Sequence, residues 1–472
     1  MHTMVTRSRS SAGTSVVVGF HTITRVSSPK SPRASETAWS GTATVIMIAS
    51  LAHGARRFRG SDTKVPHRMP KTVYGRTLLY MHPNTNPFTP GAGVTPARLV
   101  GRDDLVEAFT IAVERRSLSR PANGMMVYGL RGTGKTVLLN HFASIAGERE
   151  WIVIQAEAAK NPTTSFLERL SGKLSLHLRR LAQPSVSERT KHALGAFKGF
   201  TLEVGLGHFG VGIEIDPQYL RPYTGDISLD MPDMLTTVAQ ALQERRGGLA
   251  IMVDELQDLP RAELSALLMS AHESNQMNAP FLLCGAGLPS LPRVLAETKS
   301  YSERLFDFAR LDVLDPASAR RVLVEPVEEL GEKWDDAGLQ YILDSAQRYP
   351  YFLQVFGKAA WDTAAMSPIG LDDAKVARSV GFDVLDQGFF LVRWERATKA
   401  ERLYLRAMAV DGDGPSAVSD VATRRHTSVQ SLGPTRARLI SKGIVYSPTH
   451  GEIQFTVPGM ATFIKRADER GW

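Results

Sequence analysis

The chain has 472 residues, enough for two or three domains, and its hydrophobic (43%) and charged (22%) fractions are ordinary for a globular protein. No apolar run reaches the roughly 18 residues of a membrane-spanning helix, so no membrane contact is expected. Cys284 is the only cysteine, which excludes an internal disulfide and favours a cytoplasmic location.

The basic charge is concentrated at the N-terminus. The chain carries a net charge of +8, and residues 1–80 alone carry about +10, which leaves about −2 for the rest. Residues 1–84 are therefore predicted to be a disordered basic segment and linker. Two alternatives remain open: an over-long start upstream of Met69 or Met81, and an organellar transit peptide, which has a similar Arg- and Ser-rich composition.

Between Leu99 and Thr298, short apolar runs alternate with amphipathic helical patterns. The runs are M-M-V-Y, W-I-V-I-Q-A, L-A-I-M-V-D and F-L-L-C-G. Short apolar strands separated by helices indicate a parallel sheet covered on both faces, so the fold class is α/β with a three-layer core.

One stretch interrupts this pattern. Residues 199–216 alternate apolar and polar residues in two halves around Gly207 and His208, which predicts a β-hairpin with one apolar face. The hairpin is expected to be an insertion in the sheet, serving as a structural flap; a binding element is the alternative.

The stretch G-L-R-G-T-G-K-T fits the phosphate-loop pattern G-x-x-x-x-G-K-[ST] between a strand and a helix. Its glycines allow the backbone to wrap phosphates, and the helix that follows adds its N-terminal N–H groups. Lys135 is expected to reach the β- and γ-phosphates, and the Thr136 hydroxyl to bind Mg²⁺. The predicted loop residues are Gly129, Leu130, Arg131, Gly132, Thr133, Gly134, Lys135, Thr136 and Val137.

A second apolar strand ends in two acids, Asp254 and Glu255, about 119 residues after Lys135. Asp254 suits the Mg²⁺ shell, and Glu255 suits a general base that polarises the attacking water. Taken alone, such a pair would more often cap a helix. Together with the phosphate loop, it predicts a site for ATP and Mg²⁺.

These motifs, with L-V-G-R-D-D-L-V-E-A-F at residues 99–109, resemble an AAA+ P-loop ATPase of the replication-initiator and STAND neighbourhood. The resemblance covers roughly residues 85–467. It implies an ATP hydrolase in which Val100, Gly101 and Arg102 line the base pocket. It also implies an AAA+ domain at 85–312 and a helical lid at 313–392.

The sequence departs from that family at two positions. The polar residue expected after F-L-L-C-G is absent, and the nearest hydroxyl there is Ser290. The lid stretch Q-R-Y-P-Y-F-L-Q-V-F-G resembles the G-x-P signature of STAND proteins, which implies that Pro350 approaches the phosphates and leaves Arg348 as a weak arginine substitute. Slow hydrolysis is therefore expected, as in a nucleotide-dependent switch.

Arg304, in S-Y-S-E-R-L-F, stands where AAA+ proteins often place an inter-subunit arginine finger, which implies a homo-oligomer in which it is catalytic. The alternative to a catalytic role is that Arg304 forms an ion pair with Glu303 or a nearby acid on a solvated helix.

Residues 393–472 change in character. Three short helical patterns, the last running from Pro434 to Gly443, precede two strands around a Pro/Gly turn, and this order resembles a winged helix. Between Val421 and Gly451 there are five basic residues and no acid, which predicts contact with double-stranded DNA. The basic residues are Arg424, Arg425, Arg436, Arg438 and Lys442.

Two outputs therefore remain open. One is a slow ATP-dependent switch coupled to DNA through the winged helix. The other is a STAND-like signalling ATPase whose winged helix packs against protein partners that the sequence does not name.

Overall fold

The computed structural model describes residues 81, 83–91, 93–159, 164–182 and 186–469, all within one compact unit, Pro70–Trp472. The predictions for residues 1–80 lie outside the described residues. No helix in these ranges is long and apolar enough to cross a membrane.

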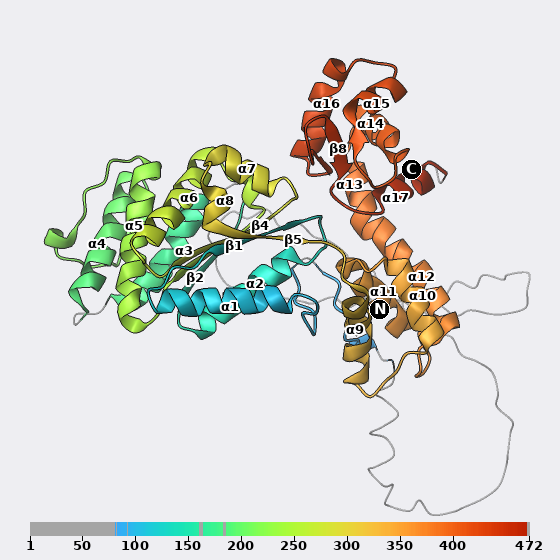
Figure 1. Ribbon diagram of the computed structural model, residues 1–472, viewed down its shortest axis with the longest axis horizontal. Coiled ribbons are helices and arrows are strands. Elements are labelled where there is room, and N and C mark those ends of the chain that lie inside the picture. Colours follow the sequence, from blue (N-terminus) through green and yellow to red (C-terminus); the bar gives the residue numbers. More distant parts are fainter. Residues whose placement is uncertain (1–80, 82, 92, 160–163, 183–185, 470–472) are drawn as a thin grey trace, which may run out of the picture. The chain divides into compact units, whose positions relative to one another are not determined.

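A five-stranded parallel sheet forms the centre of the region predicted as the AAA+ domain (Figure 1), in the order β2-β3-β4-β1-β5. The four predicted apolar runs are β1 (Gly124–Gly129), β2 (Ile152–Glu157), β3 (Leu249–Asp254) and β4 (Phe281–Gly287). The edge strand β5 (Phe306–Leu311) was not predicted, because only its two end residues are buried and its apolar pattern is weak. The phosphate loop follows β1 and the acid pair stands at the end of β3, and β4 lies between these two strands. Because the strands are parallel, both motifs lie at the same carboxyl edge of the sheet.

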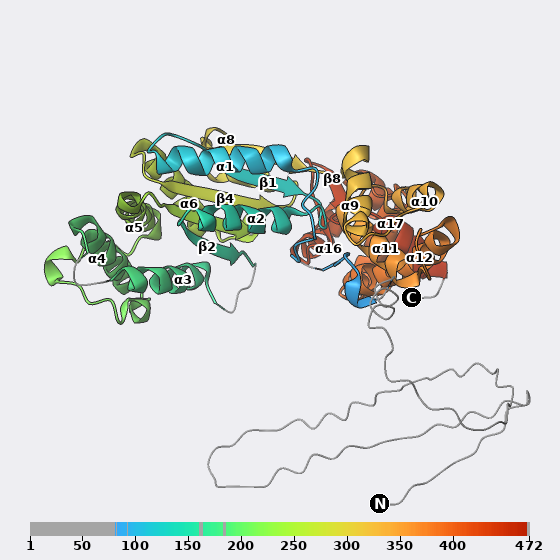
Figure 2. The ribbon, with the colours of Figure 1, turned by 90° about the horizontal axis from the view of Figure 1, so that it is seen from below.

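The two faces of the sheet have separate apolar cores. Helices α1 (Asp103–Ser117) and α2 (Lys135–Glu148) cover one face (Figure 1 and Figure 2), where they pack against Met125, Val127 and Met252 of the strands. Helices α3 (Phe166–Leu181), α5 (Ile227–Leu242) and α6 (Arg261–Gln276) cover the other. Successive strand residues enter opposite cores, as the alternation of side chains along a strand requires. The three-layer α/β prediction is confirmed.

The predicted hairpin at 199–216 is wrong. This stretch contains the end of α4 (Glu188–Glu203) and the 3₁₀ turn η2 (Gly207–Gly210), followed by η3 (Pro217–Tyr219). The buried residues Ala193, Phe197 and Phe200 recur at helical rather than strand spacing, and they face α5. Leu202 and Val211, which the hairpin would have placed on its apolar face, are 52% and 67% exposed.

After the sheet, the chain forms the helices α9 (Pro316–Glu328), α10 (Asp336–Ala346) and α11 (Pro350–Thr363). The short helices α7 (Leu291–Thr298) and α8 (Ser302–Leu305) precede β5. A single helical run then continues from α12 (Leu371–Val384) through the π-helical turn η6 (Leu385–Leu391) into α13 (Val392–Glu395). A π-helical turn inside an α-helix is uncommon and often marks a functional site.

The C-terminal region has the predicted order of helices and hairpin. Its helices are α14 (Lys399–Ala409), α15 (Val418–Arg424) and α16 (Val429–Ser441), and its antiparallel strands are β6 (Ser416–Ala417), β8 (Glu452–Phe455) and β7 (Val445–Tyr446). This arrangement is consistent with a winged-helix domain. A further helix, α17 (Met460–Glu469), packs against α14.

The start of α16 differs from the prediction. Pro434 lies inside the helix, and the helix begins after Ser428, whose hydroxyl caps it by accepting from the Ser431 N–H at 3.2 Å. Capping by a serine stabilises an earlier start than proline at the first turn would give. Gly443, with φ +65°, ends the helix as expected.

A third apolar core joins the helices after the sheet to the C-terminal region. It extends from Phe88 and Val100 through α9–α13 to Ala467. The segment just after the predicted linker contributes to it: Phe88 is 2% exposed and packs against Gly357 on α11.

Candidate functional site

The phosphate loop folds as its glycines predict. Gly132 (φ +89°) and Gly134 (φ +92°) adopt left-handed conformations that a side chain would disfavour, and Gly134 caps the first turn of α2. The Lys135 ammonium is 6% exposed and donates to the carbonyls of Gly129 (3.0 Å) and Leu130 (2.8 Å). Burial lowers the pKa of Lys135, and the charges of Glu255 and Asp254 oppose that shift.

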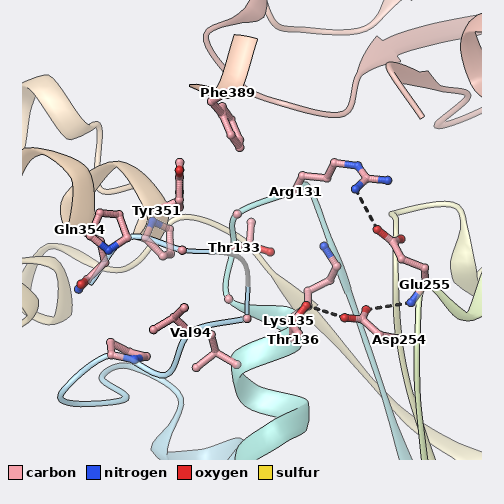
Figure 3. Close-up of a pocket in the computed structure, with 18 of the residues that line it drawn as sticks. Val94, Arg131, Thr133, Lys135, Thr136, Asp254, Glu255, Tyr351, Gln354 and Phe389 are labelled. Atoms are coloured by element: carbon pink, nitrogen blue, oxygen red, sulfur yellow. Dashed lines mark hydrogen bonds and ion pairs between the residues drawn. The ribbon is translucent and has the colours of Figure 1, made fainter. Parts of the chain in front are cut away.

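The second motif lies directly across from the first (Figure 3). The Thr136 hydroxyl donates to a carboxylate oxygen of Asp254 at 2.5 Å, and the other oxygen of Asp254 accepts from the Glu255 N–H at 2.8 Å. A hydroxyl and a carboxylate side by side are the oxygen donors that Mg²⁺ prefers. The two residues, each predicted to serve the Mg²⁺ site, are 118 positions apart in the chain.

Glu255 is held by contacts that the sequence did not indicate. Its backbone is left-handed (φ +51°), which is uncommon outside glycine and typical of strained functional positions. One carboxylate oxygen pairs with the Arg131 guanidinium at 3.2 Å, and the other accepts from the Gln257 amide at 2.9 Å. These two contacts therefore fix the orientation of the Glu255 carboxylate.

Gln257 also lies against the end of β4, where a polar side chain was expected. Its amide oxygen accepts from the Leu288 N–H at 3.1 Å. A Cβ on Gly287 would come within 2.2 Å of that oxygen, so glycine at this position leaves room for Gln257. Ser290, the hydroxyl considered from the sequence, instead precedes α7 and does not line the cavity.

A cavity of about 770 Å³ opens above the loop and the acid pair. Its lining comes from several parts of the chain, among them the segment before α1, the phosphate loop and the acid pair, the end of β2, the start of α11, residues of η6 and α13, and the end of α16. In Figure 3, Val94, Tyr351 and Gln354 lie on one side of the loop, and Arg131 and Glu255 lie on the other. Val94 and Tyr351 thus lie across the loop from the charged pair formed by Arg131 and Glu255.

The start of α11 and the C-terminal region both bond to the tip of the loop. The Tyr351 N–H donates to the Gly132 carbonyl at 3.2 Å, and the Tyr349 hydroxyl donates to the Arg131 carbonyl. The Arg131 N–H donates to the Thr456 carbonyl, just after β8, at 3.0 Å. Three consecutive backbone groups of the loop thus connect to segments more than 200 residues away in the chain.

These residues fit a nucleotide with Mg²⁺. A triphosphate needs concentrated N–H donors and positive charge, which the loop, Lys135 and Arg131 supply. The Arg131 Nε is buried and has no hydrogen-bond partner among the residues that the structure describes, so the site holds an unused donor there. Thr136 and Asp254 would hold the metal, since they present its preferred ligand atoms.

A comparison with family models decides the assignment of this region. Residues 98–283 match the family described as "AAA ATPase domain". This part of the chain is an AAA ATPase domain.

The other comparisons add no function. Residues 387–464 match a family described as a domain of unknown function, DUF8462. The chain is also similar to the Walker-type ATPase of Pyrococcus abyssi (15% identity, TM-score 0.48, 78% of this chain and 96% of that one). No match was found among the curated proteins.

Two further solved structures have lower TM-scores. One is the Thermotoga maritima RuvB Holliday junction branch migration motor (14% identity, TM-score 0.39, 81% of this chain and 99% of that one). The other is Cdc6p from Pyrobaculum aerophilum (15% identity, TM-score 0.39, 81% and 97%). At such scores, the likeness carries no function over to this chain.

Outside the loop of the AAA domain, some predicted nucleotide contacts lie at the cavity and others do not. Val100, Arg102 and Pro350 line it. Gly101 does not; it is left-handed (φ +73°) and packs against Ser318 at the start of α9. Arg348 is exposed and does not line the cavity, so it is not placed as a substitute lid arginine.

The remaining catalytic prediction is Arg304, which follows the residues matched by the AAA family. Arg304 lies on α8, is exposed, and is not among the lining residues; no ion pair with Glu303 is found in the described ranges. Its role as an inter-subunit finger stays a prediction. Cys284 is a fully buried strand residue that accepts from the Met125 N–H, and burial raises its pKa to about 12.

Three of the five basic residues predicted to contact DNA are engaged within the chain. Arg424 forms a two-pronged ion pair with Asp411, one contact being 2.6 Å. Arg438 and Lys442 both pair with the buried Glu401, at 3.4 and 2.6 Å. Lys442 also lines the cavity beside the AAA domain.

Several lining residues were missed from the sequence. The most informative are Phe389, Arg393 and Arg396, which come from η6, α13 and the turn after it. No motif marks them, because only the packing of a distant helix brings them to the loop. Tyr351 is the lining residue that the sequence could have indicated, because it directly follows Pro350 in the stretch compared with STAND proteins.

Proposed function

We propose that this protein is an ATP-dependent switch: it binds ATP and Mg²⁺ at the cavity, hydrolyses ATP slowly, and changes the placement of residues 313–472 with the nucleotide state. The observation that carries this proposal is the pair of contacts made by Arg131. Its side chain pairs with Glu255 at 3.2 Å, and its backbone N–H bonds to Thr456 at 3.0 Å. One loop residue thus links the proposed general base to the C-terminal region.

Each residue has a separate part in the proposed reaction. Lys135 and the loop N–H groups bind the phosphates, and Thr136 and Asp254 hold the metal, which when bound neutralises phosphate charge. Glu255 accepts a proton from the attacking water. While Arg131 and Gln257 hold both of its oxygens, Glu255 is not positioned to do so, and Arg131 must release it first.

This arrangement supports slow hydrolysis. The release of Glu255 requires a change at Arg131, and Arg131 is bonded to the C-terminal region. The fraction of molecules in the competent arrangement then limits turnover, because a minor state contributes only in proportion to its population.

Glu255→Gln tests the switch. The variant keeps a side chain of similar shape but loses the base, so steady-state hydrolysis is expected to fall by about 10²–10⁴-fold while ATP affinity is retained. Trapped with ATP, it should show faster amide hydrogen exchange at residues 452–458 than wild type with ADP.

The matched control is Glu244→Gln, which removes an exposed acid outside the cavity and should leave both measurements unchanged. A wild-type turnover on the order of 100 s⁻¹, at the upper end of the kinase range, would contradict the switch. Identical exchange in the two nucleotide states would contradict the coupling.

For the output of the switch, DNA binding through the proposed winged helix is the first candidate. Arg425 and Arg436 support it, since no ion pair to an acid is found for either in the described ranges. The ion pairs of Arg424, Arg438 and Lys442 favour the second candidate, a STAND-like module that packs against protein. The two candidates differ in their salt dependence.

Changing Arg425 and Arg436 together to alanine tests the first candidate. If each contacts a phosphate, the slope of log affinity against log salt should decrease by about one per residue lost. The measurement needs a chain without residues 1–80, because their excess positive charge would bind DNA without specificity. An absence of salt-dependent binding with both ATP and ADP would leave the protein-packing candidate.

Two further proposals accompany this one. Arg304 would complete the site of a neighbouring copy, which makes the active form a homo-oligomer. The single, buried Cys284 supports work in the reducing cytoplasm.

A further inference from the structure

Most cations around the cavity have an assigned partner. Arg131 pairs with Glu255, Lys442 with Glu401, and Arg98 with Glu329. Arg102 donates to the Asp312 carbonyl at 2.9 Å. For Arg393, no ion pair with a carboxylate is found in the described part of the chain, although it lines the same cavity and is only partly exposed.

The guanidinium of Arg393 is nevertheless fixed in position. It donates to the Phe389 carbonyl one turn earlier and lies over the Phe389 ring, 4.4 Å from its centroid. Phe389 in turn stacks on Tyr351, with centroids 4.8 Å apart and planes 27° apart. Figure 3 shows Phe389 directed toward the loop. Guanidinium has five N–H donors, so most remain available for a ligand.

The electrostatic surroundings of Arg393 favour an anion. Burial, together with the positive charges of Arg131 and Arg396, lowers the pKa of Arg393 to about 10, although Tyr351 and Tyr349 act in the opposite direction. Buried cations are normally paired, because an unpaired one loses its hydration without compensation. A negatively charged ligand in the cavity would relieve this cost.

The neighbours of Arg393 also indicate which part of the ligand it meets. Arg131 is among the charges that act on Arg393, and Arg131 binds Glu255. Tyr351, on which Phe389 stacks, donates its N–H to the Gly132 carbonyl at the tip of the loop, next to Arg131. Glu255 marks the end of the loop where water attacks the terminal phosphate, whereas Val94 lies across the loop from it. Arg393 therefore belongs to the terminal-phosphate end of the cavity.

We propose that Arg393, contributed from α13 outside the AAA domain, binds the terminal phosphate of ATP and makes the protein distinguish ATP from ADP. This inference rests on the proposed function, and it names the residue that reads the nucleotide state. ATP then bridges the loop and the helical run 371–395, whereas ADP does not.

The test measures the affinities of the full-length chain for ATP and ADP by titration calorimetry, using wild type and Arg393→Ala. Loss of a charge-assisted contact to the terminal phosphate is expected to weaken ATP binding about 10- to 100-fold and to change ADP binding less than about threefold. Arg393→Lys keeps a cation but not the planar fork, so it should keep part of the preference for ATP.

Arg378→Ala is the matched control, because Arg378 also lies over a phenylalanine ring (Phe382, 4.8 Å) but does not line the cavity. It should change neither affinity. An equal loss of ATP and ADP affinity in Arg393→Ala, or no loss of either, would overturn the inference.

A separate comparison distinguishes failure of this inference from failure of the proposed function. If Lys135→Ala abolishes ATP binding while Arg393→Ala does not alter the ratio of ATP to ADP affinity, only the inference about Arg393 fails. If wild type binds no ATP, both fail.

Discussion

Replacing Lys135 by alanine is expected to weaken ATP binding by at least about 100-fold, which is the largest effect on nucleotide affinity predicted for a single substitution at the cavity. Removing one member of a buried, hydrogen-bonded charge contact costs roughly 2–5 kcal/mol, and each 1.4 kcal/mol corresponds to tenfold in affinity. Binding of a fluorescent ATP analogue at equilibrium measures the change.

The loss should not come from unfolding. Burial lowers the pKa of Lys135, so folding disfavours its charged form, and the variant is expected to be no less stable than wild type without nucleotide. Lys375→Ala, which removes an exposed lysine paired with Asp372 on α12, serves as the control and should bind normally. Equal ATP affinity in Lys135→Ala and wild type would refute the assignment of the loop as the phosphate site.

Replacing Glu401 by alanine is expected to have the largest effect on stability, about 2–4 kcal/mol. Its side chain is fully buried at the first turn of α14, where it accepts from the Thr398 N–H at 2.7 Å in a capping box. The same carboxylate binds Arg438 and Lys442 on α16. Alanine removes the cap and leaves both cations without their partner.

Glu401→Gln separates the cap from the charge, because glutamine at this position can still accept from the Thr398 N–H. It should lose less stability than alanine, as judged from the thermal midpoint of the C-terminal region. Burial opposes ionisation of Glu401, but the hydrogen bonds from Lys442 and Thr398 hold its pKa below the ordinary 4.5.

The pH dependence follows from the sign of that shift. A carboxyl whose folded-state pKa is depressed stabilises the fold above its unfolded pKa and loses that contribution as pH falls through the folded value. The difference between wild type and Glu401→Gln should thus be constant above about pH 5 and shrink below 4.5. A difference that does not change with pH would show that the charge of Glu401 does not matter.

The sequence was sufficient for four of the five strands of the sheet and for the loop, and the reason is local. Strands buried on both faces must be continuously apolar, and a phosphate loop needs glycines and a lysine within eight residues. The hairpin error has the opposite cause: Phe200 and Leu202 look alike in sequence, but only the packing of α4 against α5 decides which one is buried.

The basic residues near the C-terminus show a similar limit. Counting charges between Val421 and Gly451 left out Asp411 and Glu401, because they lie earlier in the chain. The fold of α14 brings both acids to the cations. Arg393 was missed for the same reason, since its neighbours Arg131 and Tyr351 are 262 and 42 positions away from it in the chain.

The third apolar core has a mechanical consequence. Phe352 of α11, Phe390 of η6 and Phe463 of α17 pack in series, with centroid distances of 6.4 and 5.3 Å. The helices after the sheet and the C-terminal region should therefore open and close in hydrogen exchange as one cooperative unit. In the described ranges, that unit joins the sheet through two short connections, near residues 100–102 and 312–315. A rotation of a few degrees at these two hinges would move all helices of this unit together as one rigid body. The displacement would be largest at the ends farthest from the loop.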